Sequence, residues 1–250
     1  MTLAHQAAPA PVVTALHRAA PECKLAALVV FVVAVALVPH GQVLPYVVDA
    51  GLLLVVAVWA RAEPGFLARR LLIEVPFVAF VLLLPFVTAG PRVELLGVAL
   101  SEPGLWTAFG IAAKATLAVL AAGVLAATTS GPEIVAGLER LRVPRTLTAV
   151  AGFALRYVGV IVDELAALRQ ARVARGDDPR WLWQVRTVAR SAGTLVVRCF
   201  ERGERVHVAM LARGFDGRMP VLGLAAPATA RAWTVASVLL LPAAVGTVVA

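Results

Sequence analysis

The sequences Ala-Arg-Val-Ala-Arg-Gly at 171–176 and Met-Leu-Ala-Arg-Gly at 210–214 decide how this chain is interpreted. Each ends a helical-looking run that is rich in arginine. Glycine just past a helix end can adopt a positive φ and close the last turn. Arginine in that last turn lies at the negative end of the helix dipole. One such site alone would be an ordinary helix C-cap, but two near-identical sites predict a matched pair of helix tips.

The chemistry of the two tips suits contact with a partner. The first tip is Ala174, Arg175 and Gly176, and the second tip is Ala212, Arg213 and Gly214. A small alanine lets a helix end approach another surface closely, and a guanidinium makes forked hydrogen bonds to carboxylates and carbonyls. Two equivalent tips fit a partner with two equivalent grooves, such as a homodimer or pseudo-dimer.

The rest of the chain is apolar enough to lie in a bilayer. Of its 250 residues, 60% are hydrophobic and 15% charged, whereas soluble domains average about 25% charged residues. A membrane-spanning helix needs about 20 apolar residues. The sequence therefore predicts an all-α integral membrane protein with five spans, at about 24–38, 43–60, 71–89, 105–129 and 229–249.

The spans and tips divide the chain into four predicted segments. The first lacks the long apolar core of a cleaved signal peptide, and the third holds both tips. In the third segment, Ser130-Gly-Pro-Glu133 predicts the start of a short helix that ends at Leu141. The segments are a cytoplasmic tail (1–22), a four-span membrane domain (23–129), cytoplasmic or interfacial coupling helices (130–228) and a last membrane helix (229–250).

The distribution of basic residues predicts the orientation. The net charge is +8, and sixteen of the 23 basic residues lie between Ser130 and Arg231. The predicted loops 39–45 and 91–104 hold a single arginine. Because basic loops stay on the cytoplasmic side, the N-terminus and the 130–228 region are predicted to be cytoplasmic. Topology thus explains the basic surplus, and no motif for binding nucleic acid is seen.

Several short motifs outside the spans are more specific than hydrophobicity. They are Thr128-Thr-Ser-Gly-Pro-Glu133, Leu141-Arg-Val-Pro-Arg145, Arg156-Tyr157, Ala174-Arg-Gly176, Cys199-Phe-Glu-Arg202, Glu204-Arg205 and Ala209-Met-Leu-Ala-Arg-Gly-Phe-Asp-Gly-Arg218. With these motifs, the chain resembles the T component of energy-coupling factor (ECF) transporters, in particular the cobalt-type CbiQ subfamily. The resemblance extends from about Pro21 to Val249.

The resemblance implies a role in a multi-subunit importer of the bacterial or archaeal cell membrane. T components hold a substrate-binding S component against two cytoplasmic ATPase subunits, and their two Ala-Arg-Gly tips dock in grooves of the ATPases. It implies that the partner subunits hydrolyse ATP with magnesium and that this chain binds neither cofactor nor metal. The continuation Phe215-Asp-Gly-Arg218 favours a cobalt-type S component. Nickel fits nearly as well, because the S component selects the substrate.

Two charged residues inside the predicted spans leave alternatives open. Lys114 lies within the fourth span, where a charge costs several kcal/mol unless it is paired or hydrated. It can contact the S component or a buried acid such as Glu74, or it can extend to the outer interface. Glu74 lies near the inner end of the third span, within reach of the headgroups. Asp49, near the start of the second span, is likewise expected to stay close to the membrane surface.

Other functions find less support in the residues. No GxxxxGK[ST] loop is present, so ATP hydrolysis by this chain itself is not expected. A lipid-modifying membrane enzyme would need clustered acids and histidines, but Asp49, Glu74 and Lys114 are far apart in sequence. A stand-alone transporter would need polar residues at mid-membrane in at least two spans. The remaining alternatives are a T component of a nickel or vitamin importer and such a lipid-modifying enzyme.

Overall fold

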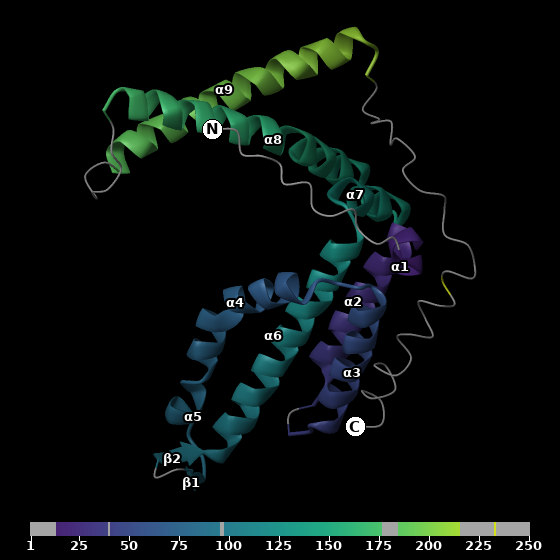
Figure 1. Ribbon diagram of the computed structural model, residues 1–250, viewed down its shortest axis with the longest axis vertical. Coiled ribbons are helices and arrows are strands. Elements are labelled where there is room, and N and C mark those ends of the chain that lie inside the picture. Colours follow the sequence, from purple (N-terminus) through teal and green to yellow (C-terminus); the bar gives the residue numbers. More distant parts are fainter. Residues whose placement is uncertain (1–13, 40, 96–97, 177–184, 216–232, 234–250) are drawn as a thin grey trace. The chain divides into compact units, whose positions relative to one another are not determined.

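A computed structural model describes residues 14–39, 41–95, 98–176, 185–215 and 233 of the chain (Figure 1). The chain divides into two compact units with the boundary between Gly137 and Leu138. The described residues up to Gly137 are called the membrane unit here, and those from Leu138 to Phe215 the crossed-helix unit. The predicted last span, 229–249, lies outside the described residues except for Trp233.

The membrane unit is built from apolar helices. Four predicted spans within the described residues are confirmed as helices, and the third is broken into α4 and α5. The elements are α1 (Ala15–Arg18), α2 (Pro21–Leu37), α3 (Leu44–Trp59), α4 (Pro64–Val81), α5 (Leu84–Val87), β1 (Arg92–Leu95), β2 (Val98–Ser101), α6 (Glu102–Thr128) and α7 (Gly131–Arg140), whose last residues pass the unit boundary.

Helix α4 begins earlier than the sequence analysis expected. The predicted spans at about 43–60 and 71–89 imply a loop at 61–70, but the helix begins at Pro64, because proline suits the first turn. Arg70 stays compatible with this apolar helix by lying over the ring of Phe66, with 4.8 Å from Cζ to the ring centroid.

Helix α6 lies at the centre of the membrane unit and packs against α2, α3, α4 and α5 (Figure 1). The buried core is made of apolar side chains from α2 and its C-cap, from α3 and from α6, including Phe31, Val35, Val38, Leu53, Leu117, Ala121 and Val124. The outward faces expose large apolar side chains, such as Leu54 on α3 and Ile73 on α4, which is 78% exposed. Such a surface suits contact with lipid.

By length and composition, three helical segments among the described residues can cross a membrane: Pro64–Val87, Glu102–Thr128 and Arg145–Ala174. Leu44–Trp59 is a shorter apolar helix. The last of the three long segments falls in the region predicted to be cytoplasmic or interfacial. Its second half carries Asp163, Glu164, Arg169 and Arg172, which are costly inside a bilayer.

A β-hairpin connects α5 to α6, where the sequence analysis expected a loop. Strands β1 and β2 pair in antiparallel register, with Arg92 opposite Ser101 and Leu95 opposite Val98. Ser101 then caps α6, since its Oγ accepts a hydrogen bond from the Gly104 N–H at 3.4 Å.

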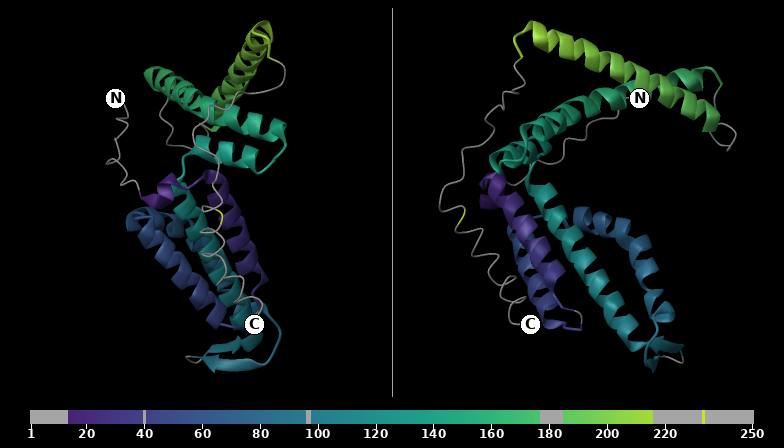
Figure 2. Two further views of the ribbon diagram at one scale, coloured as in Figure 1. Left: turned by 90° about the vertical axis from the view of Figure 1, so that its right-hand side faces the viewer. Right: turned by 180° about the vertical axis from the view of Figure 1, so that it is seen from behind.

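The crossed-helix unit consists mainly of two long helices, α8 (Arg145–Ala174) and α9 (Val185–Ala212). Both were predicted, and residues 177–184 between them lie outside the described part. The two helices cross each other and run in roughly opposite directions, as the two further views in Figure 2 also show. Their C-terminal ends therefore lie at opposite ends of the pair.

Candidate functional site

The first tip has the geometry of a helix C-cap. Helix α8 ends at Ala174, and Gly176 has a φ of 84°. The N–H of Arg175 donates to the carbonyl of Arg172 at 2.9 Å, and that of Gly176 to the carbonyl of Val173 at 3.0 Å. The glycine closes the last turn in the left-handed conformation. Any residue with a Cβ would adopt this conformation only at a cost in free energy.

The second tip repeats this geometry at the end of α9. Gly214 has a φ of 80°. Its N–H donates to the carbonyl of Leu211, and the Phe215 N–H donates to the carbonyl of Met210, both at 3.0 Å. These two bonds form a complete Schellman motif. The two triplets are thus matched in conformation as well as in sequence.

Both tips are open to a partner. All six residues of the two triplets are exposed. A Cβ added to Gly176 or to Gly214 would meet no atom within 4 Å. The glycines are therefore required by their backbone conformation and not by crowding within the described structure. Docking of these tips in another protein stays a prediction.

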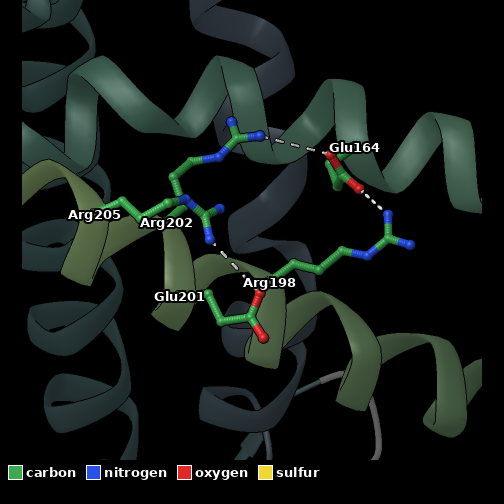
Figure 3. Close-up of polar contacts among 5 residues, drawn as sticks. All are labelled: Glu164, Arg198, Glu201, Arg202 and Arg205. Carbon is green, nitrogen blue, oxygen red and sulfur yellow. Dashed lines mark hydrogen bonds and ion pairs between the residues drawn. The ribbon is translucent and has the colours of Figure 1, made fainter.

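An ionic cluster joins the two helices where they cross (Figure 3). Glu164 of α8 pairs with Arg198 of α9, and its second oxygen lies 3.9 Å from Nη2 of Arg202. Glu201, Arg202, Glu204 and Arg205 alternate in charge along α9, a pattern that favours ion pairs within this helix or a solvated charged face. The Glu201–Arg205 pair is present at 3.8 Å, but Arg202 reaches across to α8.

A pocket of about 460 Å³ lies between α8 and α9. It is mainly apolar, and the rings of Phe153 and Tyr157 stack on one side with their centroids 6.3 Å apart. The cluster residues Glu164, Arg198 and Arg202 also line it. Sequence analysis did not identify Glu164 or this pocket, because both depend on where the two helices cross. Other apolar lining residues are Ile161, Val206, Met210 and Phe215.

Lys114 and Glu74 have hydrogen-bond partners inside the membrane unit. The Lys114 ammonium donates to the carbonyls of Ala36 and Val38, each at 2.9 Å. It thereby binds carbonyls that the end of α2 leaves without helical partners. Glu74 is 7% exposed and accepts a hydrogen bond from the Thr116 hydroxyl at 3.1 Å. Contact of either residue with an S component stays a prediction.

Asp49 is buried within the membrane unit. Its side chain is 2% exposed, and one carboxyl oxygen has no hydrogen-bond partner. Its side of α3 is enclosed by protein, and its expected position close to the membrane surface stays a prediction. The hydroxyl of Tyr46, one turn earlier, is also buried without a partner. Among the residues that the structure describes, no group of three or more His, Cys, Asp or Glu side chains is placed to hold a metal ion.

These features define a multi-pass α-helical membrane protein with a separate pair of crossed helices. The sequence model of the CbiQ family, described as "Cobalt transport protein", matches residues 13–221. The chain belongs to the CbiQ family. This family is a membrane component of transporters and not a family of enzymes.

Three relatives illustrate the similarity. The chain is 31% identical over 165 residues to Cobalt transport protein CbiQ of Rhodobacter capsulatus, covering 63% of this chain and 66% of that protein. It is 26% identical over 216 residues to the Energy-coupling factor transporter transmembrane protein EcfT of Brevibacillus brevis, covering 81% of each. It is 27% identical over 221 residues to the EcfT protein of Bacillus subtilis, covering 83% of each.

Proposed function

We propose that this chain is the T component of an ECF importer for cobalt. In this proposal the two tips dock in two ATPase subunits, and the crossed helices transmit the motion of these subunits to an S component. The names of the relatives support the proposal, since they include a cobalt transport protein and ECF transmembrane proteins.

The observation that carries the proposal is the matched pair of exposed tips. Their backbones have the same left-handed closure, and each holds an exposed arginine just before the glycine. They lie at opposite ends of one crossed pair (Figure 1). Two equivalent ends that point apart suit two equivalent grooves on a dimer, and guanidinium groups suit carboxylates or carbonyls in those grooves.

The crossing itself suits a transmitting element. Glu164 ties α8 to α9 through Arg198 and Arg202, so displacement of one tip is passed to the other helix. We assign the apolar pocket between the helices to the S component, because a membrane partner offers apolar side chains that can fill it.

The remaining assignments follow from the same proposal. The N-terminus and residues 130–228 face the cytoplasm, where the ATPases bind and hydrolyse ATP with magnesium. The S component binds the metal. Cobalt is chosen over nickel because of the family description and the name of the Rhodobacter capsulatus relative.

Co-purification tests the docking of the tips. The chain is expressed with its ATPase and S subunits as wild type, Arg175→Ala, Arg213→Ala and the double variant. A hydrogen bond to a charged group contributes about 1.5–3 kcal/mol, so each single variant should weaken ATPase retention and the double variant should abolish it. Arg169→Ala and Arg190→Ala are matched controls, because both arginines are exposed on the same helices away from the tips. Full retention of the ATPases by the double variant would overturn the proposal.

A further inference from the structure

The strongest unassigned feature of the membrane unit is the environment of Lys24, at the start of α2. Its ammonium donates to the carbonyl of Thr128 at 2.9 Å, to the hydroxyl of Thr129 at 3.2 Å and to the carbonyl of His17 at 3.2 Å. An ammonium has three N–H donors, and all three are used. Lys24 therefore ties the start of α2 to the end of α6.

Two of the three acceptors, on Thr128 and Thr129, lie at the joint between α6 and α7. Thr128 is the last residue of α6, and Thr129 is extended, with φ −144° and ψ 125°. A helix end of this kind has free carbonyls and would bend easily. In the first turn of α7, Glu133 accepts the Ser130 N–H at 2.7 Å. The Lys24 ammonium thus holds the end of α6 and the joint, and Glu133 holds the joint to the first turn of α7.

A second contact holds α7 against α2. A Cβ added to Gly137 would lie 2.8 Å from Cδ1 of Leu25 and 3.1 Å from the backbone nitrogen of Glu22. The neighbouring Ala136 is 5% exposed. Helix α7 therefore contacts the start of α2 closely at Gly137, where the membrane unit ends.

We propose that Lys24 is a positioning residue that makes α7 move as one body with α2 and α6. The inference rests on the proposed T-component function. The chain leaves this clamped segment at Leu138 and continues into α8, which carries the first tip. With the joint fixed, displacement of α8 is passed to the membrane helices. With the joint loosened, the same displacement bends residues 129 and 130 and is lost.

The test uses two threonines as a matched pair. Thr129 accepts a bond from Lys24, whereas the hydroxyl of Thr128 donates within α6, to Val124 at 3.0 Å. Both side chains are buried. The three hydrogen bonds of the Lys24 ammonium are called the clamp here. Thr129→Val removes one of them, and Thr128→Val removes only a bond within one helix. Lys24→Met removes the whole clamp, and Lys24→Arg keeps a cationic donor.

The first readout is amide hydrogen exchange of the full chain in lipid nanodiscs. Lys24→Met should speed exchange of residues 129–137 by about tenfold or more, because a charged hydrogen bond is worth at least that factor. Thr129→Val should have a smaller effect in the same segment, and Thr128→Val and Lys24→Arg should leave it near wild type. Unchanged exchange in Lys24→Met would overturn the clamp, whatever the function of the chain.

The second readout is cobalt taken up per ATP hydrolysed by the reconstituted complex. Lys24→Met should lower this ratio several-fold while ATP hydrolysis continues, and Lys24→Arg should restore it. A ratio equal to that of wild type would overturn the positioning role. If the wild-type complex neither assembles nor takes up cobalt, the proposed function is wrong. The hydrogen-exchange measurement still tests the clamp in that case.

Discussion

Gly214 shows at the scale of one residue how a cap and a docking site can share a position. Its φ of 80° is needed for the Schellman bonds that end α9. A Cβ added to it would nevertheless meet no atom within 4 Å. The conformation was predictable from the position of glycine after a helical run. The partners of Lys114 were not, because the end of α2 comes near it only in the folded chain.

Substitutions of Gly214 separate the two roles. Gly214→Ala should destabilise the last turn of α9 by about 1 kcal/mol, since alanine adopts positive φ at a cost. Gly214→Asn should keep the turn, because asparagine tolerates this conformation, but it places a side chain on the docking surface. Hydrogen exchange of residues 210–215 reports the turn, and ATPase retention reports docking. If Gly214→Asn retains the ATPases as well as wild type does, the glycine acts only as a cap.

At the scale of elements, Glu164 sets a measurable coupling between α8 and α9. Its pair with Arg198 is partly exposed, with side chains 26% and 54% accessible, so the coupling should be below about 1 kcal/mol and should shrink at high salt. A double-mutant cycle of Glu164→Gln and Arg198→Ala on the unfolding free energy measures it. No described ion pair joins Arg190 to Glu164, so a cycle of Glu164→Gln with Arg190→Ala should give a coupling energy of zero. A coupling that is the same at low and high salt would contradict an ionic link.

The α7–α2 contact predicts that replacing glycine by alanine changes the unfolding free energy in opposite directions at two helical positions. Gly137→Ala should destabilise the membrane unit by about 1–3 kcal/mol, because the backbone of Glu22 and Pro21 lies within 3.1 Å of the new Cβ. Gly159→Ala on α8 meets nothing within 4 Å and should stabilise by up to about 1 kcal/mol, from helix propensity. Unfolding free energies in one detergent give both values. If both substitutions changed the unfolding free energy in the same direction, the close approach of α2 to Gly137 would not determine the effect of the added Cβ.

The elements also show where sequence patterns stop being sufficient. Apolar runs located α2, α3 and α6 to within a few residues, since burial in lipid requires their length. The start of α4 at Pro64 and the hairpin after α5 were missed, because short segments give weaker patterns than long apolar runs do. The first tip and the second tip were found because capping is local in sequence. The Glu164 cluster and the pocket were not, because they depend on the crossing.

At the scale of the whole molecule, contacts and hydropathy group the start of the coupling segment differently. The predicted segment 130–228 includes α7, which up to Gly137 packs with the membrane helices, and the functional division of the chain stays a prediction. Packing of Gly137 on Leu25 explains the difference, since hydropathy cannot register a contact between remote helices. In the proposed function, α7 is then the segment through which motion of the crossed helices enters the membrane unit.

In the proposed function the two tips move when the ATPases change state, and a distance measured between the tips reports this motion. Spin labels at Ala171→Cys and Ala209→Cys lie on exposed positions, each three residues before the alanine of its tip. Cys199 is replaced by serine, and Cys23 is 3% exposed and is left in place. In the reconstituted complex, we predict distance distributions that differ between the nucleotide-free and ATP-bound states. Identical distributions in a complex that still takes up cobalt would contradict the account.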